Sequence, residues 1–211
     1  MKVAIIFLDY QRHDFSTLAM KSIAEAGHPF DLFTINRKGI AAAINEGIHK
    51  AKGYDAIVTC ANDIVMPFDW LKRMVQAAEA IPNTGMCGIH TVEGLEPEEE
   101  INGIRLHRSF TAFGNVLIPM KAIDTIGGFN EDYDPYGMQD ADFAYRLNKT
   151  GFVNYYLHGL KADHVGNDVG QQTEYRKMKD KGLAESADKW KFWTTFYDYS
   201  ENYIIDLKQM V

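Results

Sequence analysis

Apolar runs alternate with amphipathic stretches along the N-terminal part of the chain. The runs are rich in β-branched side chains and lack a polar alternation, which is typical of strands buried on both faces of a sheet. The stretches between them repeat apolar residues at helical spacing, for example at Ile40, Ile44 and Ile48. The pattern predicts strands at 2–8, 30–35, 56–61 and 85–92 and helices at 14–26, 40–50 and 67–78. Asp14 is the predicted cap of the first helix, and Pro67 the predicted start of the third.

The second half of the chain is less regular. It predicts strands at 113–119 and 153–158, a helix at 139–149, and loops at 93–100 and 127–137, where Glu, Gly, Pro and Asp are frequent. Asp142 and Arg146 form a favourable i, i+4 pair on the helix. Strand–helix alternation predicts an α/β fold with a mostly parallel sheet between two layers of helices.

The chain beyond residue 171 is charged and helical and then aromatic. We expect one domain at 1–170 and a helical extension at 171–211 that packs on it. Packing explains the aromatic residues of the extension, among them Tyr197, Tyr199 and Tyr203; a membrane-surface or partner-binding helix is the alternative.

Composition narrows the class of protein. The 211 residues are 46% hydrophobic and 24% charged, which is ordinary for a globular chain and argues against disorder. The net charge of −7 disfavours a nucleic-acid partner, whereas surplus carboxylates suit divalent cations. No apolar stretch is long enough for a transmembrane segment. Cys60 and Cys87 are too few for a disulfide scaffold, so we expect two buried thiols and a cytoplasmic protein.

Three loops carry residues suited to chemistry. Asp63 follows a buried strand, where a carboxylate faces the ligand side of a parallel sheet. Asp140 lies in the first turn of a helix, whose dipole is expected to lower its pKa. His164, after the last strand, is of the type that most often binds metals. Helix capping is the alternative for both aspartates, and an ordinary surface position for the histidine.

Six short motifs follow one another in an order that resembles the GT-A-fold glycosyltransferases of the family 2 kind. They are the opening strand and turn at 3–14, the glycine- and asparagine-bearing helix at 39–47, the Asn-Asp loop at 61–63, the Gly-Gly-Phe-Asn-Glu loop at 127–131 with Asp140 beyond it, His164, and the pair Lys189-Trp190. The resemblance covers roughly residues 1–190. Two positions depart from the family pattern: Ala61 replaces the first acid of the metal loop, and Gln139 replaces the Glu before the catalytic Asp.

The resemblance implies a Rossmann-like, mixed and mostly parallel sheet flanked by helices. It also implies metal-dependent, inverting transfer of a sugar from a UDP-, GDP- or dTDP-sugar to an acceptor hydroxyl. Asp140 would be the catalytic base, and Asp63 and His164 would bind Mn²⁺ or Mg²⁺. The implied donor-binding residues are Leu8, Asp9, Tyr10, Asn36, Gly39, Asn45 and Asn62, although Gly39 also fits a simple turn into a helix.

The acceptor side is less defined. Trp70, Phe110 and Tyr136 are candidates for the wall of an acceptor cleft, and each also fits the core. A glycan, a lipid carrier, a protein and a small molecule all remain open as acceptors. The expected location is the cytoplasm, with a peripheral position at the membrane as a further possibility.

Two other functions compete. A sugar-nucleotide nucleotidyltransferase shares a similar sheet but needs a glycine-rich phosphate loop after the first strand, and residues 8–15 contain no glycine. A non-catalytic module that binds nucleotide-sugars is the other alternative, and it predicts binding without turnover.

Overall fold

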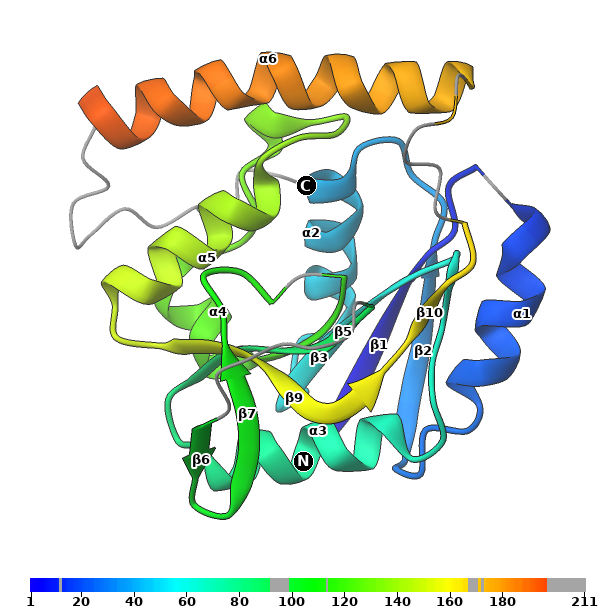
Figure 1. The fold of residues 1–211 in the computed structure, drawn as a ribbon, viewed down its shortest axis with the longest axis vertical. Coiled ribbons are helices and arrows are strands. Elements are labelled where there is room, and N and C mark those ends of the chain that lie inside the picture. Colours follow the sequence, from blue (N-terminus) through cyan, green and yellow to red (C-terminus); the bar gives the residue numbers. More distant parts are fainter. Residues whose placement is uncertain (12, 92–98, 113, 167–170, 172, 197–211) are drawn as a thin grey trace.

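The computed structural model describes residues 1–196 apart from 12, 92–98, 113, 167–170 and 172. Over these residues the chain builds an eight-stranded sheet in the order β2-β1-β3-β8-β5-β9-β7-β6 (Figure 1). Its strands are β1 (Val3–Leu8), β2 (Phe30–Ile35), β3 (Ala56–Ala61), β5 (Thr84–His90), β6 (Glu99–Ile101), β7 (Ile104–Arg108), β8 (Asn115–Pro119) and β9 (Val153–Lys161). Strands β1, β2, β3, β5 and β9 run in one direction, and β7 and β8 run against them. The predicted mixed, mostly parallel sheet is confirmed.

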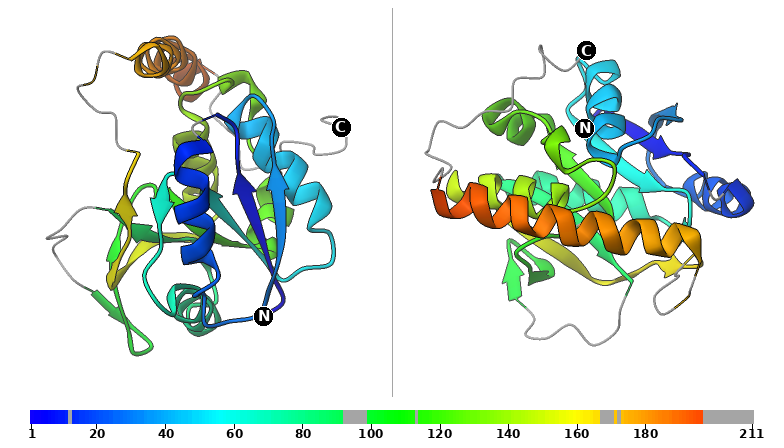
Figure 2. Two further views of the ribbon diagram at one scale, coloured as in Figure 1. Left: turned by 90° about the vertical axis from the view of Figure 1, so that its right-hand side faces the viewer. Right: turned by 90° about the horizontal axis from the view of Figure 1, so that it is seen from above.

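Helices cover both faces of the sheet (Figures 1 and 2). They are α1 (His13–Ile23), α2 (Ile40–Lys50), α3 (Trp70–Ala80), α4 (Met120–Ile126) and α5 (Gln139–Lys149). Strand β1 shows the arrangement, because Val3, Ile5 and Phe7 pack in one core cluster and Ala4 and Ile6 in the other. The first cluster includes residues of α1 and α3, and the second residues of α2, α4 and α5. An apolar run without alternation therefore marks a strand with a core on each side.

Most predicted elements occur where the periodicity indicates them, with differences at their ends. The observed bounds of β2, α2, β3 and α5 are those predicted. Helix α1 begins at His13, so Asp14 lies in its first turn and is not the cap. Helix α3 begins at Trp70 after an N-cap at Asp69, which has a φ of 56°, so Pro67 precedes the helix and does not open it.

The hairpin of β6 and β7 is absent from the sequence prediction. Residues 93–98 of the predicted acidic loop lie outside the described residues, and Glu99 and Glu100 belong to β6. Asn102 and Gly103 make the turn with φ values of 50° and 78°. An Asn-Gly pair between Ile101 and Ile104 is a strong signal for a two-residue hairpin, and this signal could have revealed the hairpin.

A second, two-stranded sheet joins β4 (Ile64–Val65) to β10 (Asp163–His164). Neither strand was predicted, nor were α4 and the short 3₁₀ helix η1 (Glu131–Tyr133). Two-residue strands have no periodicity of their own, so only their pairing defines them. This pairing sets His164 opposite Ile64. Ile64 directly follows Asp63 in the chain, so His164 comes close to Asp63 as well.

Helix α6 (Glu174–Phe196) contacts η1 and lies across the top of the molecule in Figure 1. Figure 2 shows it from above and along its axis. None of the described helices, the long α6 included, combines the length and the apolar composition needed to cross a membrane. The aromatic residues Tyr197, Tyr199 and Tyr203 lie outside the described residues.

Candidate functional site

A cavity of about 340 Å³ opens at the carboxyl side of the central strands. Strands, loops and helix α5 all contribute to its wall. Its lining residues are Ile64, Ile89, His90, Thr91, Thr111, Gly114, Asp140, Tyr156 and His164. The structure therefore brings two of the sequence-predicted residues, Asp140 and His164, to one cavity.

Asp63 and His164 meet although they lie far apart in the chain. The Nε2 atom of His164 is 3.3 Å from the Oδ2 atom of Asp63. Gly166 makes the approach possible, because a Cβ atom there would lie 2.5 Å from the Cβ atom of Asp63. Two ligands that are each about 2.0–2.3 Å from one ion are separated by roughly 3 Å, so the observed distance fits a shared cation. Among the described residues, no group of three or more His, Cys, Asp or Glu side chains surrounds such a point.

The carboxyl ends of β1 and β3 carry a hydrogen-bonded cluster. The Oδ1 atom of Asp9 accepts hydrogen bonds from Ser16 at 2.6 Å and from Asn62 at 3.3 Å, and lies 3.0 Å from Nδ1 of His13. Burial alone would raise the pKa of Asp9, but these hydrogen bonds outweigh it and hold the pKa below its usual value. The Asn62 amide also donates to the carbonyl oxygen of Gln11 at 2.7 Å. Asn62 thus ties the loop at 61–63 to the end of β1.

The other predicted donor residues at this edge lie side by side. Leu8, the last residue of β1, pairs with Ile35 of β2, and Asn36 follows directly. The Asp9 amide extends this pairing by donating to the carbonyl oxygen of Ile35 at 3.0 Å. Tyr10 is exposed beside them. The structure therefore brings Leu8, Asp9, Tyr10 and Asn36 to one edge of the sheet.

Gly39 and Asn45, just before and on α2, both contact the 127–134 segment. The Asp134 carboxylate accepts from the backbone amides of Ala41 and Ala42 at 2.9 and 3.0 Å, and a Cβ atom on Gly39 would lie 2.5 Å from it. Asn45 is buried and exchanges hydrogen bonds of 2.8 Å with both the carbonyl oxygen and the amide of Phe129. Both residues serve to hold the 127–134 segment on α2. Asp134 and Phe129, the residues they contact, lie more than eighty positions further along the chain, so no local pattern could reveal these contacts.

Asp140 lies in the first turn of α5, at the wall of the cavity. Burial raises the pKa of its carboxyl group and outweighs the lowering effect of the backbone amides of Ala141 and of Asp140 itself. The expected depression by the helix dipole is therefore wrong, because desolvation of the charged form is the larger effect here. Burial, together with the Asp140 charge, also raises the pKa of Tyr156, across the same cavity.

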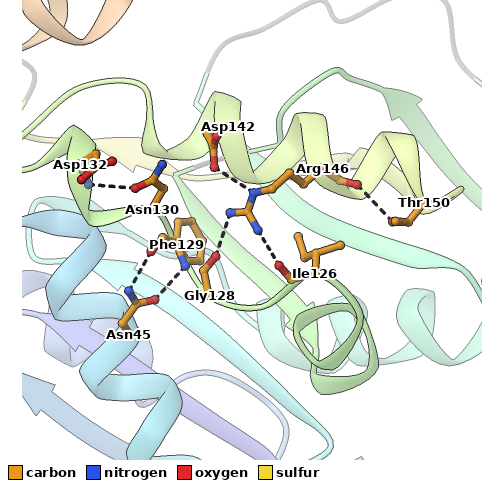
Figure 3. A network of polar contacts seen from close by, with 9 residues as sticks. All are labelled: Asn45, Ile126, Gly128, Phe129, Asn130, Asp132, Asp142, Arg146 and Thr150. Carbon is orange, nitrogen blue, oxygen red and sulfur yellow. Dashed lines mark hydrogen bonds and ion pairs between the residues drawn. The ribbon is translucent and has the colours of Figure 1, made fainter. Parts of the chain in front are cut away.

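A buried ion pair anchors α5 to the loop before it (Figure 3). The Arg146 Nε atom is 2.9 Å from the Oδ2 atom of Asp142, and the guanidinium also donates to the carbonyl oxygens of Ile126 and Gly128 at 2.8 Å each. The predicted i, i+4 pair is confirmed, and its exposed fractions of 2% and 0% make it a core feature. The two carbonyl contacts are what the sequence did not indicate.

Helix α6 holds the same loop from the outer side. Lys189 donates from its Nζ atom to the carbonyl oxygen of Asp132 at 2.8 Å. Gly137 and Gly182 allow close packing, since a Cβ atom on Gly137 would overlap Ser186 and one on Gly182 would lie 2.4 Å from the carbonyl oxygen of Tyr136. The segment that precedes Asp140 is thus fixed by α2, α5 and α6 together.

The model of the family "Glycosyl transferase family 2" matches residues 2–130. The chain belongs to glycosyl transferase family 2. One curated relative of this family 2 chain is hyaluronan synthase of Pasteurella multocida, 30% identical over 92 residues, which are 42% of this chain and 9% of the synthase.

Solved glycosyltransferases share the fold of this family 2 chain. GalNAc-T7 with UDP, GalNAc and Mn²⁺ superposes with a TM-score of 0.63 at 11% identity, over 78% of this chain and 44% of that one. The mannosyltransferase PcManGT of Pyrobaculum calidifontis, with GDP-Man and Mn²⁺, gives 0.62 at 15% identity, over 80% and 58% of the two chains. The expected GT-A architecture is confirmed. The chain spans less than two thirds of each of these proteins.

The aromatic and cysteine residues that the sequence analysis singled out differ in how deeply they are buried. Trp70 is wholly buried and belongs to the core, not to a cleft. Lys179 lies over the ring of Tyr136, 5.3 Å from its centroid. Phe110 is 48% exposed. Cys60 and Cys87 are buried free thiols, and burial raises the pKa of both, that of Cys87 to about 12, so neither provides a thiolate nucleophile at neutral pH.

Proposed function

We propose that this chain catalyses metal-dependent, inverting transfer of a sugar from a nucleotide-diphosphate donor to an acceptor hydroxyl. One observation carries the proposal: Asp140 and His164 line the same cavity, and His164 is 3.3 Å from Asp63. A base and a pair of metal-ligating groups are thereby within reach of one substrate. Family membership and the complexes of GalNAc-T7 with UDP and of PcManGT with GDP-Man support a nucleotide-sugar donor.

Asp140 has the role of the base. As the acceptor oxygen bonds to the anomeric carbon, its hydroxyl proton passes to the Asp140 carboxylate, and the bond from the anomeric carbon to the diphosphate oxygen breaks. A positioned base of this kind contributes about 10²–10⁴-fold to the rate. Among the described residues that line the cavity, Asp140 is the one carboxylate. Single displacement with inversion forms no covalent bond to the enzyme, so Asp140 as base is the one catalytic side chain that it requires.

Asp63 and His164 would hold the divalent ion, Mn²⁺ or Mg²⁺. Their distance fits a shared ion, and a mixed oxygen and nitrogen ligand pair suits Mn²⁺. When bound, the ion neutralises charge on the diphosphate leaving group. Asp9, Tyr10, Leu8 and Asn36 form the edge on which we place the nucleotide, with Asn62 tying that edge to the metal loop.

The test is release of nucleoside diphosphate. The protein is incubated with UDP-, GDP- and dTDP-sugars and Mn²⁺, with and without saccharide acceptors, and with EDTA as a control. We expect release with one donor, loss of release in EDTA, and loss of transfer but not of donor binding in Asp140→Asn. Asp124→Asn is the matched control, because Asp124 is an exposed aspartate on α4.

Other outcomes overturn the proposal in distinct ways. Donor binding without release by the wild type would identify a non-catalytic binding module. Release of pyrophosphate from a nucleoside triphosphate and a sugar phosphate would identify a nucleotidyltransferase. Neither binding nor release with any of the three donors would reject a nucleotide-sugar site altogether.

A further inference from the structure

The turn formed by residues 109–112 lies directly on the central sheet. It joins β7 to the segment that leads into β8, and Ala112 is buried. Gly88 of β5 makes this position possible, since a Cβ atom there would lie 2.2 Å from the carbonyl oxygen of Ala112. Any side chain at Gly88 would lift the turn from the sheet, because the obstacle is backbone and not a mobile side-chain end.

Asparagine side chains fix the backbone of this turn at Phe110. Asn154 of β9, 2% exposed, donates from Nδ2 to the carbonyl oxygen of Phe110 at 2.9 Å and accepts from the amide of Met86 at 3.0 Å. Asn148 of α5 donates to the same Phe110 oxygen at 3.3 Å. Gly85 provides the room for Asn154, because its Cβ atom would lie 2.5 Å from Asn154 Oδ1. Two glycines and two asparagines thus hold one turn.

The side chain mounted on this rigid turn is nevertheless 48% exposed. A phenylalanine left in water forgoes the hydrophobic stabilisation that burial would give, and a single exposed aromatic needs no explanation by itself. Here the backbone beneath it is held by buried groups, so the ring is presented outward on a fixed support. A preorganised aromatic face is suited to the apolar face of a sugar ring, at a low entropic cost of binding.

The residues next to Phe110 in the chain, from Ser109 to Ala112, are uncharged. Ser109, Thr111 and Ala112 complete the turn, and the hydroxyl of Ser109 donates to the carbonyl oxygen of Thr111 at 2.6 Å. Arg108, the nearest cation in the chain, is paired with Glu99 through two hydrogen bonds. This favours a neutral saccharide over an anionic ligand.

The distance between the turn and Asp140 indicates how long a saccharide must be to reach both. Thr111 lines the same cavity as Asp140, so the turn borders the site. Asn148, whose side chain donates to the backbone carbonyl oxygen of Phe110, lies eight residues beyond Asp140 on α5, which is about 12 Å along the helix axis. A single sugar at Asp140 is too short to cover that distance, whereas a chain of sugars is long enough.

We propose that Phe110 is the platform for a distal sugar of an oligosaccharide acceptor whose terminal hydroxyl faces Asp140. This inference rests on the proposed function and deepens it, because it names the acceptor as a neutral saccharide longer than one ring. It assigns Phe110 a role in acceptor specificity and none in donor binding.

The test compares acceptors of different length in Phe110→Ala, with Phe68→Ala as the matched control. Phe68 is a more exposed phenylalanine, at 72%, that lies just before α3 and outside the turn of residues 109–112. The probes are glucose, xylose and N-acetylglucosamine, each as the monosaccharide and as the β-linked tetrasaccharide. We expect Phe110→Ala to lower kcat/KM for the tetrasaccharide that accepts by roughly three- to tenfold. Monosaccharide transfer and donor hydrolysis stay unchanged, and Phe110→Trp retains the preference.

The design separates this inference from the proposed function. An equal effect of Phe110→Ala on monosaccharides and tetrasaccharides overturns the platform, as does no effect on either. So does a chain that hydrolyses its donor but neither binds nor glycosylates any saccharide of the panel. Absence of donor hydrolysis with every nucleotide-sugar is instead the failure of the proposed function. Thermal unfolding of Phe110→Ala is expected to stay cooperative with a small loss of stability, since the ring is 48% exposed and the turn is held by its backbone.

Discussion

Arg146 binds Asp142 at 2.9 Å and, with the same guanidinium, the carbonyl oxygens of Ile126 and Gly128. Both charged side chains are buried. The pair therefore does more than stabilise one helix: it fixes the direction in which the chain leaves α4 and returns as α5 (Figure 3). Because Asp140 lies two residues before Asp142 on α5, the position of the proposed base depends on this pair.

Removing one partner of the buried pair should lower the stability of the fold. Asp142→Asn leaves the Arg146 charge buried without a counter-charge, and we expect the free energy of unfolding to fall by about 3–5 kcal/mol. Chemical denaturation measures it. The matched control is Lys50→Met, which breaks the exposed i, i+4 pair with Glu46 and should cost far less. Equal losses in the two variants would contradict a structural role for the buried pair.

The pH dependence of transfer should reflect the raised pKa of Asp140. The deprotonated carboxylate is the active form, so the rate rises with pH through the Asp140 pKa, and burial sets that pKa above the usual 3.8. The acidic limb of kcat should therefore lie at higher pH than for an ordinary aspartate. Asp140→Asn should lose about 10²–10⁴-fold of the transfer rate. A pH profile with no acidic limb above pH 3.8 would contradict the assignment.

The same shift makes a prediction about stability. A carboxyl group whose pKa is higher in the folded state than in the unfolded state stabilises the fold at low pH, and this contribution is lost as the pH rises through the folded pKa. Asp140→Asn should thus be more stable than the wild type at pH 7, and the difference should vanish below about pH 3.8. Urea denaturation at the two pH values tests this, with Asp124→Asn as the exposed control.

Alanine substitutions at Gly39 and Gly53 distinguish the cost of backbone strain from the cost of a steric clash. Both have positive φ, 94° and 85°, but a Cβ atom at Gly53 meets nothing within 4 Å. We expect Gly53→Ala to cost about 1–2 kcal/mol of unfolding free energy from strain alone. Gly39→Ala should cost at least about 2 kcal/mol more, because it displaces the Asp134 carboxylate from two backbone amides. Adding Asp134→Ala to Gly39→Ala should then lower the unfolding free energy little further. If the losses of the two single variants add in full, no clash with the Asp134 carboxylate exists.

His164 provides the test of the metal site. His164→Ala should raise the Mn²⁺ concentration for half-maximal diphosphate release roughly tenfold or more. Gly166→Ala should have a similar effect, because its Cβ atom would lie 2.5 Å from that of Asp63. His49→Ala, an exposed histidine on α2, is the control. An unchanged Mn²⁺ requirement in His164→Ala would remove this residue from the site.

Local patterning was sufficient to predict the layers of this fold. The β-branched runs of β1, β2 and β3 and the spacing of isoleucines on α2 depend on residues close in sequence, so each element could be recognised from its own stretch. The i, i+4 pair of Asp142 and Arg146 was predicted for the same reason. Asp63, Asp140 and His164 stood out because of their residue types and the family motifs around them.

Tertiary structure decided which of these residues meet. The pairing of β4 with β10 brings His164 to Asp63 across 101 positions, and no periodicity within two-residue strands indicates it. Asn45 and Gly39 match the family motif, but their surroundings give them structural partners. The pKa of Asp140 was misjudged from the helix alone, because the helix dipole is a local property of α5 whereas desolvation depends on everything packed around it. The sequence by itself determined the elements and the chemical groups; contacts between distant segments decided their distances, burial and charge.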